Sequence, residues 1–198
     1  MLEGELAAPE RTLTAPADVA SALDVDDARA ATIERFGRID LVVVASGVIT
    51  GSSFEDGIPA DWAEMIDVNL RGLLHATQTF AGPLLETSGR GDPADLFLLG
   101  AVSTQAHAPK FAVFNAISAA VKQLANTLRQ EYGPRGLRVH LIEPGFPPVD
   151  NSVHDPRHGR SESPLTPDAI SAVVCVSAAL PATANLAEAL LLPTATAR

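Results

Sequence analysis

The chain has 198 residues, of which 46% are hydrophobic and 19% are charged, and its formal net charge is −10. This length and apolar content can bury one sizeable core, and nothing in the sequence marks a second unit, so we expect a single domain over residues 1–198. The negative charge repels phosphate backbones and no Lys/Arg stripe offsets it, which argues against a nucleic-acid partner.

The N-terminus and the single cysteine favour a soluble cytoplasmic protein. Residues 1–6 are acidic and lack the positive and apolar regions of a signal peptide, and no apolar run is long enough to span a bilayer. Cys175 lies in an apolar stretch and has no second cysteine with which to form a disulfide, so we expect a small buried hydrophobic residue.

The first part of the chain is predicted to hold two strands and one helix. Residues 11–15 read as a short strand that ends at Pro16. Residues 25–36 read as a helix, because acidic residues early and Arg35 late suit the helix dipole. The near-continuous apolar run at residues 38–47 is typical of a strand covered on both faces by helices, so we expect it in the middle of the sheet.

Two long helices are predicted next. Residues 58–85 carry apolar side chains at helical spacing, with Pro59 and Asp61 as start signals. Residues 95–131 read as a strand, a loop and a second helix. That helix has one apolar face, made of Phe114, Ile117, Val121, Leu124 and Leu128.

The last part of the chain alternates strand, loop, helix and strand. Residues 137–142 form an apolar strand, and residues 147–164 are rich in Pro, Ser, His and Arg, which is typical of a mobile loop. Thr166 and Pro167 open a final helix, and residues 185–192 form a final strand. His154 and His158 do not make a metal site, because Pro156 lies between them and no further ligand cluster is evident.

The strand, loop and helix at residues 95–131 resemble the catalytic segment of classical short-chain dehydrogenases/reductases. In that family a Ser follows the strand, and Tyr-x-x-x-Lys opens the helix. Here the Tyr position is Phe114, the Lys position is Ser118, and the Ser position is Ala101, with Ser103 as a nearby alternative. The resemblance covers essentially the whole chain and implies an α/β, Rossmann-like, three-layer αβα fold with a mainly parallel sheet.

The resemblance also implies positions on the adenosine side of a bound NADP or NAD. Asp18 and Val19 match an Asp-Val pair that lies beside the adenine ring, although an Asp such as Asp18, taken alone, is more often a turn residue or a helix cap. The family's Asn-Asn-Ala-Gly motif corresponds to residues 44–47, so Ala45, Ser46 and Gly47 take the cofactor-pocket positions. Only Gly47 is kept, and it still allows a close backbone approach to a ribose.

Three further positions belong to the nicotinamide side in the resembled family. Pro144 and Gly145 match a Pro-Gly pair that passes under the nicotinamide, although this pair is also a common turn. Asn69 matches the Asn that kinks the long helix and holds a water of the proton relay. A polar residue that satisfies the backbone at a helix kink explains Asn69 equally well.

The first βαβ unit of the family, with its Gly-x-x-x-Gly-x-Gly turn, is missing from this sequence. Because those glycines let the backbone approach the pyrophosphate at a helix N-terminus, we expect NADP or NAD binding to be weak or lost. In the family's strand order the missing strands separate residues 11–15 from residues 38–47, so the latter strand would expose an apolar edge. Two alternatives stay open: an N-terminally truncated chain, or direct contact between those two strands.

The chain ending and the Ile142-to-Gly145 sequence look most like the branch that oxidises serine and other 3-hydroxy acids with NADP. The resemblance thus implies an ancestral NADP-dependent oxidoreductase of an alcohol or 3-hydroxy acid, with a degenerate active site and the lid-like loop at residues 147–164. One alternative is a non-catalytic partner subunit of an intact relative. Another is an enzyme without a redox cofactor that uses the same cleft, with Ser103, Ser118, His107 or Glu143 as polar groups.

An oligomer is the expected assembly, because in the resembled family the two long helices pack against their copies in a second subunit. Helices 58–85 and 114–131 keep small apolar residues that we expect on their outer faces. These are Leu73, Ala76 and Ala81 on the first helix and Ala119, Ala120, Leu124, Thr127 and Leu128 on the second. We therefore expect a homo- or hetero-oligomer, unless alanine is present only for its helix propensity.

Overall fold

A parallel β-sheet forms the centre of the computed structural model, which describes residues 8–101, 109–145 and 165–194. The four strands lie in the order β1 (Leu41–Val44), β2 (Ala94–Leu99), β3 (Leu137–Pro144) and β4 (Glu188–Leu191). All three pairings are parallel, and Leu41 lies opposite Asp95, Ala94 opposite Leu137 and Leu141 opposite Glu188.

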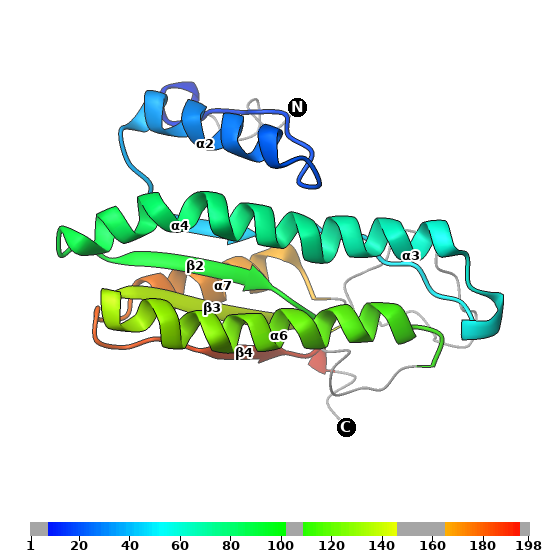
Figure 1. Ribbon diagram of the computed structural model, residues 1–198. Coiled ribbons are helices and arrows are strands. Elements are labelled where there is room, and N and C mark those ends of the chain that lie inside the picture. Colours follow the sequence, from blue (N-terminus) through cyan, green and yellow to red (C-terminus); the bar gives the residue numbers. More distant parts are fainter. Residues whose placement is uncertain (1–7, 102–108, 146–164, 195–198) are drawn as a thin grey trace.

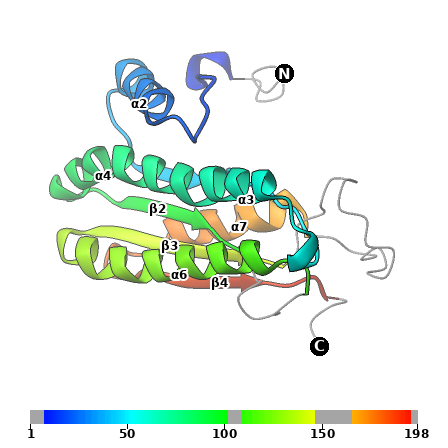
Figure 2. The same ribbon diagram turned by 45° about the vertical axis from the view of Figure 1, so that its right-hand side comes forward.

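Helices cover both faces of the sheet, as Figures 1 and 2 show. The helices α4 (Leu73–Gly89) and α6 (Ala112–Tyr132) lie on one face, and α7 (Pro167–Ala178) lies on the other. The helix α2 (Ala22–Phe36) packs on the outside of α4. The predicted Rossmann-like α/β architecture with a parallel sheet is confirmed. Short helical turns lie at Pro9–Arg11 (η1), Phe54–Asp56 (η2) and Gly133–Arg135 (η4).

The main hydrophobic core lies between the sheet and the pair α4 and α6. Side chains alternate between the two faces of a strand, and Leu96, Leu98, Val139 and Leu141 point into this core. These four side chains are at most 1% exposed. Full burial of one such side chain stabilises the fold by about 1.5–3 kcal/mol, so this layer dominates the stability of the described fold.

The predicted outer face of the two long helices is partly wrong. Leu73, Ala76 and Ala81 are only 3%, 7% and 6% exposed, and Leu128 on α6 is 7% exposed. Leu73, Ala76 and Leu128 belong to the chain's own core, because one side of α4 and α6 faces the sheet. Leu124 is partly buried against the same core, whereas Ala119, Ala120 and Thr127 are exposed on α6 as predicted.

The predicted strand at residues 11–15 does not form. Residues 12–18 have no regular structure, and the chain before them turns through η1. Local bonds replace a strand ladder, because the Arg11 N–H and the Thr12 hydroxyl both donate to the carbonyl of Ala8. A strand needs a paired neighbour, and within the described ranges no strand lies beside this segment.

The predicted position of the strand at residues 38–47 is also wrong. In the described part of the chain β1 pairs only with β2, so it is an edge strand and does not lie in the middle. Leu41 and Val43 on β1 are 37% and 39% exposed. In the described structure β1 therefore presents an apolar edge, as expected.

The predicted helix at residues 58–85 is confirmed, with one local change of helix type. It consists of α3 (Pro59–Ile66), the π-helical turn η3 (Asp67–Gly72) and α4, which follow one another without a break. A π-helical turn inside an α-helix is often found at functional sites, and this one contains Asn69.

The remaining predicted elements also form. The helix α2 begins at Ala22, since the Ser21 hydroxyl accepts a hydrogen bond from the Asp24 N–H, and Gly37 ends it with a φ of 78°. Thr166 precedes α7 as predicted. Cys175 is exposed on α7, so the predicted burial of this thiol is wrong.

Some predictions concern residues outside the described ranges. These include the lid-like loop at residues 147–164 and the residues Ser103, His107, His154 and His158. Among the described residues, no helix combines the length and the apolar character needed to cross a bilayer. In the same ranges, no group of three or more His, Cys, Asp or Glu side chains is arranged to hold a metal ion.

Candidate active site

The carboxyl ends of β1, β2 and β3 meet at one edge of the sheet, where ligands bind in open α/β folds. Residues 45–47 follow β1, Ala101 follows β2, and Gly145 follows β3. Two further residues that the sequence predicts for the site, Phe114 and Ser118, lie in the first turns of α6.

The two α6 positions that carry Tyr and Lys in the resembled family make no acid–base pair here. Phe114 packs against the hydrophobic core and has no hydroxyl. Ser118 is 6% exposed, and its hydroxyl donates to the carbonyl of Phe114 at 3.0 Å, within the same helix. Ala101 is 8% exposed and offers no side-chain donor. The one side-chain hydroxyl at these three positions, that of Ser118, is thus engaged within α6.

Lys122, one turn after Ser118, was not predicted as a site residue, although the spacing of four residues places both on one side of α6. Its ammonium lies 2.9 Å from Glu188 Oε2 and 3.2 Å from Glu143 Oε2. The hydrogen bond to Glu188, followed by that to Glu143, raises the pKa of Lys122. Lys122 ties α6 to β3 and β4, so it does not replace the missing Lys at position 118.

Asn69 holds the loop after β1 against the π-helical turn. Its amide nitrogen donates to the carbonyl of Val48 at 2.7 Å, and its amide oxygen accepts from the N–H of Val48 at 2.8 Å. Both ends of the side chain are thus engaged with one backbone residue. The structural explanation of Asn69 is supported, although the backbone it satisfies belongs to the loop rather than to the kinked helix.

The Asp18 carboxylate takes part in a local turn. Its Oδ1 accepts from the N–H of Ala20 at 2.9 Å, while the N–H of Asp18 donates to Asp24. The bond from the Ser21 hydroxyl, followed by that from the Asp18 backbone, lowers the pKa of Asp24. Asp18 is exposed and therefore remains accessible from solvent while it shapes this turn.

Both predicted parts of the adenosine side pack against η3. A Cβ atom added to Gly72 would lie 2.7 Å from Val19 Cγ2, so only glycine lets Val19 approach this closely. A Cβ atom added to Gly47 would lie 3.5 Å from Asn69 Oδ1. The structure therefore brings the turn at Asp18 and Val19 and the exposed loop at residues 45–47 to the same helical turn.

Gly145 is held by β4. Its N–H donates to the carbonyl of Leu191 at 2.6 Å, and an added Cβ atom would lie 3.1 Å from Pro193 Cδ. The glycine at this position is therefore explained by packing against the C-terminal strand. Its preceding residue, Pro144, is the last residue of β3 and is buried.

A small hollow, open to solvent, lies between the loop after β1 and the first turns of α3 and α6. Its lining includes Thr50, Trp62, Met65, Lys110 and Phe111. None of the sequence-predicted site residues lines this hollow, so it is distinct from the site that the family resemblance indicates.

No Gly-x-x-x-Gly-x-Gly turn opens a helix among the described residues. The close pair Gly89 and Gly91 ends α4 and precedes β2, so it does not open a helix beside a pyrophosphate. The chain contains no Gly-x-x-x-Gly-x-Gly sequence.

Several known proteins are similar to this chain. An oxidoreductase of Staphylococcus haemolyticus is 28% identical to this chain, over 90% of this chain and 74% of the relative. An oxidoreductase of Staphylococcus epidermidis is 30% identical, over 89% of this chain and 74% of the relative. Serine dehydrogenase from Escherichia coli superposes with a TM-score of 0.77 at 23% identity, over 91% of this chain and 76% of the other.

A second similar structure is that of a 3-ketoacyl-(acyl-carrier-protein) reductase from Brucella melitensis complexed with NADH. It superposes with a TM-score of 0.80 at 21% identity, over 89% of this chain and 75% of the other. These structural similarities show the same fold. The model of the short chain dehydrogenase family matches residues 3–155. The chain therefore belongs to the short-chain dehydrogenase family of oxidoreductases.

Proposed function

We propose that this chain is a degenerate cytoplasmic short-chain dehydrogenase that no longer catalyses the NADP-dependent oxidation or reduction of an alcohol or 3-hydroxy acid. The observation that carries this proposal is the pair at the start of α6: Phe114 has no hydroxyl, and the Ser118 hydroxyl is bonded to the Phe114 carbonyl. General acid–base catalysis is worth about 10²–10⁴ in rate. Loss of the hydrogen-bond donor at Ala101 removes a further contribution.

The proposal includes weak binding of NADP(H). It is supported by the lack of the glycine turn and by Ala45 and Ser46, which stand where the family has two Asn side chains. Isothermal titration calorimetry of the purified chain with NADPH tests this point, with an intact family member as the positive control. Micromolar affinity for this chain would contradict the proposal.

Restoring the catalytic residues provides a second test. We expect that Phe114→Tyr, Ser118→Lys and Ala101→Ser together do not create a dehydrogenase, because the hydride would come from a cofactor that the chain does not anchor. The assay is NADP-linked turnover of serine or 3-hydroxypropionate, with circular dichroism to verify that the variant is folded. Measurable turnover by this triple variant would show that the cofactor site is competent.

A second candidate function is a non-catalytic subunit that pairs with an intact relative or with its own copy. The outer face of α6 supports this candidate, since Ala119, Ala120 and Thr127 are exposed small residues that permit close helix packing. Light scattering of the chain and of Ala120→Glu tests it, with Ala30→Glu on the exposed side of α2 as the matched control. A monomer at micromolar concentration that Ala120→Glu leaves unchanged would end this candidate.

An enzyme without a redox cofactor is the weakest candidate. Two of its proposed polar groups have other partners: the Ser118 hydroxyl bonds within α6, and Glu143 is 3% exposed and paired with Lys122. No nucleophile and base can be assigned among the described candidates.

A further inference from the structure

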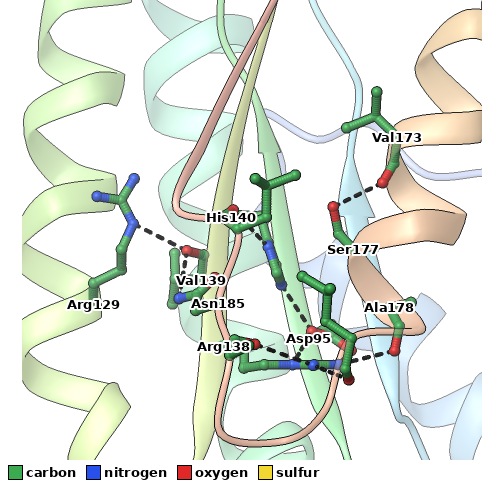
Figure 3. A network of polar contacts seen from close by, with 12 residues as sticks. Asp95, Arg129, Arg138, Val139, His140, Val173, Ser177, Ala178 and Asn185 are labelled. Atoms are coloured by element: carbon green, nitrogen blue, oxygen red, sulfur yellow. Dashed lines mark hydrogen bonds and ion pairs between the residues drawn. The ribbon is translucent and has the colours of Figure 1, made fainter.

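A buried polar cluster lies at the edge of the sheet opposite the candidate active site, and Figure 3 shows it from close by. Its members Asp95, Arg138 and His140 are 3%, 4% and 1% exposed and lie near the starts of β2 and β3. Both carboxylate oxygens of Asp95 accept hydrogen bonds from Arg138 at 2.7 Å, and His140 Nε2 lies 2.8 Å from Asp95 Oδ1. The carboxylate on β2 therefore holds two side chains of the neighbouring strand β3.

The same cluster holds the C-terminal unit, which we define as residues 167–191, comprising α7, β4 and the segment between them. Arg138 donates to the carbonyl of Ala178 at 3.1 Å and to carbonyls of the connecting segment. His140 Nδ1 contacts the carbonyl of Leu186 at 2.9 Å, just before β4. One pair of side chains thus contacts the unit from the last residue of α7 to the approach to β4, which couples its parts.

Apolar packing attaches the C-terminal unit only weakly. None of its residues belongs to the main hydrophobic core of the described structure. Ser177 is the one fully buried residue of α7, and Val176 is 62% exposed. The strand β4 alternates between exposed and half-buried residues, whereas β3 is buried along its whole length. The core between the sheet and the pair α4 and α6 therefore does not depend on the unit.

The side chains that bind the unit keep other partners when the unit leaves. Arg138 and His140 retain the carboxylate of Asp95. Arg129 on α6 donates to the carbonyl of Ala187 at 2.8 Å, but it also donates to a carbonyl of β3 at 3.0 Å. None of these three side chains loses its last partner, so the large cost of an uncompensated buried charge is avoided.

We propose that the C-terminal unit opens as one cooperative unit from a sheet that stays folded. The helix α7 lies over the face of the sheet to which Phe97 and Ile142 point, and both residues are at most 1% exposed. Opening uncovers this apolar face, which keeps the opened form rare. It also frees Gly145 of the candidate site, because the Gly145 N–H is bonded to Leu191 of β4.

Native-state hydrogen exchange of the full chain at increasing urea, below the global transition, tests the opening. The reporters are the N–H groups of Leu141 and Gly145, which donate to carbonyls of the unit, and that of Ser177 in α7. A 12-residue helix is marginal in water, so Ser177 exchanges once α7 leaves the sheet. Ala125, fully buried in α6, is the reference for global unfolding.

The three reporters are expected to share one opening constant, larger than that of Ala125. This constant should rise with urea, because opening exposes surface, but less steeply than that of Ala125, because global unfolding exposes more. Such behaviour distinguishes a cooperative unit from independent fluctuations at single hydrogen bonds.

Two variants with similar expected effects separate opening from global unfolding. Ile39→Val removes a methyl group from the core outside the unit, so protection of Ala125 should fall about 2- to 12-fold while the reporters stay unchanged. Asn185→Ala removes the bond from the unit to the Val139 carbonyl at 3.2 Å. It should lower protection of the reporters and of Ala125 by one common factor of about 2 to 12.

Three results would overturn the proposal. Reporter protection equal to that of Ala125 in the unmodified chain would show that the unit leaves only in global unfolding. Lower reporter protection in Ile39→Val would show that the opened form does not keep the rest of the fold. Unequal reporter constants that do not respond to urea would show separate fraying in place of one unit.

Discussion

Replacing Asp95 by Asn is the most direct perturbation of the buried cluster, because it removes the charge and leaves the volume almost unchanged. Asp95 accepts hydrogen bonds from Arg138 through two nitrogens, both at 2.7 Å, and contacts His140 at 2.8 Å. An Asn amide has one acceptor oxygen, but its amino group would place its N–H donors against a nitrogen of Arg138 or His140. The Arg138 guanidinium then stays buried without a counter-charge.

The expected cost follows from this burial. Removing one partner of a buried ion pair lowers the free energy of unfolding by about 3–5 kcal/mol, because the other charge is left uncompensated. The value applies here since the side chains of both Asp95 and Arg138 are at most 5% exposed. With a urea m-value of about 2 kcal/mol per M, the midpoint of unfolding should fall by about 2 M.

Urea unfolding at pH 7, followed by circular dichroism, measures this cost. Asp92→Asn is the matched control, because Asp92 pairs with Arg38 at 2.7 Å but its side chain is 46% exposed. An exposed pair of this kind contributes at most about 1 kcal/mol. A cost for Asp95→Asn below about 1 kcal/mol, or equal to that of the control, would refute the role assigned to the cluster.

Two further predictions concern packing and pH. Gly72→Ala should destabilise the fold by about 1–3 kcal/mol, because the new Cβ would lie 2.7 Å from Val19 Cγ2. Gly89→Ala in the last turn of α4 meets nothing within 4 Å and should stabilise by about 0.4–1 kcal/mol, and thermal unfolding of both variants checks the contrast. Burial raises the pKa of Asp95, but hydrogen bonds from His140 and Arg138 outweigh it and lower that pKa below 3.8. Asp95 thus contributes stability above pH 3.8 that is lost as the pH falls through its lowered pKa, and urea midpoints at several acid pH values should show this loss in the unmodified chain but not in Asp95→Asn.

The amino-acid sequence determined the local structure and the family. The helices at residues 58–85 and 114–131 were predictable because their apolar residues repeat at helical spacing, a property of neighbouring residues alone. The match of Phe114 and Ser118 to the family's Tyr and Lys positions comes from the same local order along one helix, and it stays a prediction. These inferences need no knowledge of what packs against the helix.

Tertiary structure alone decided which surfaces are buried and which polar groups meet. Leu73 and Leu128 were expected on an outer face, but burial depends on which side of each helix meets the sheet. The position of β1 at the edge depends likewise on which strands pair. Asp95 and Arg138 lie 43 residues apart, and they meet only because β2 and β3 pair in one register. Contacts between residues this far apart depend on strand order and register, and for such pairs a local sequence pattern carries no signal.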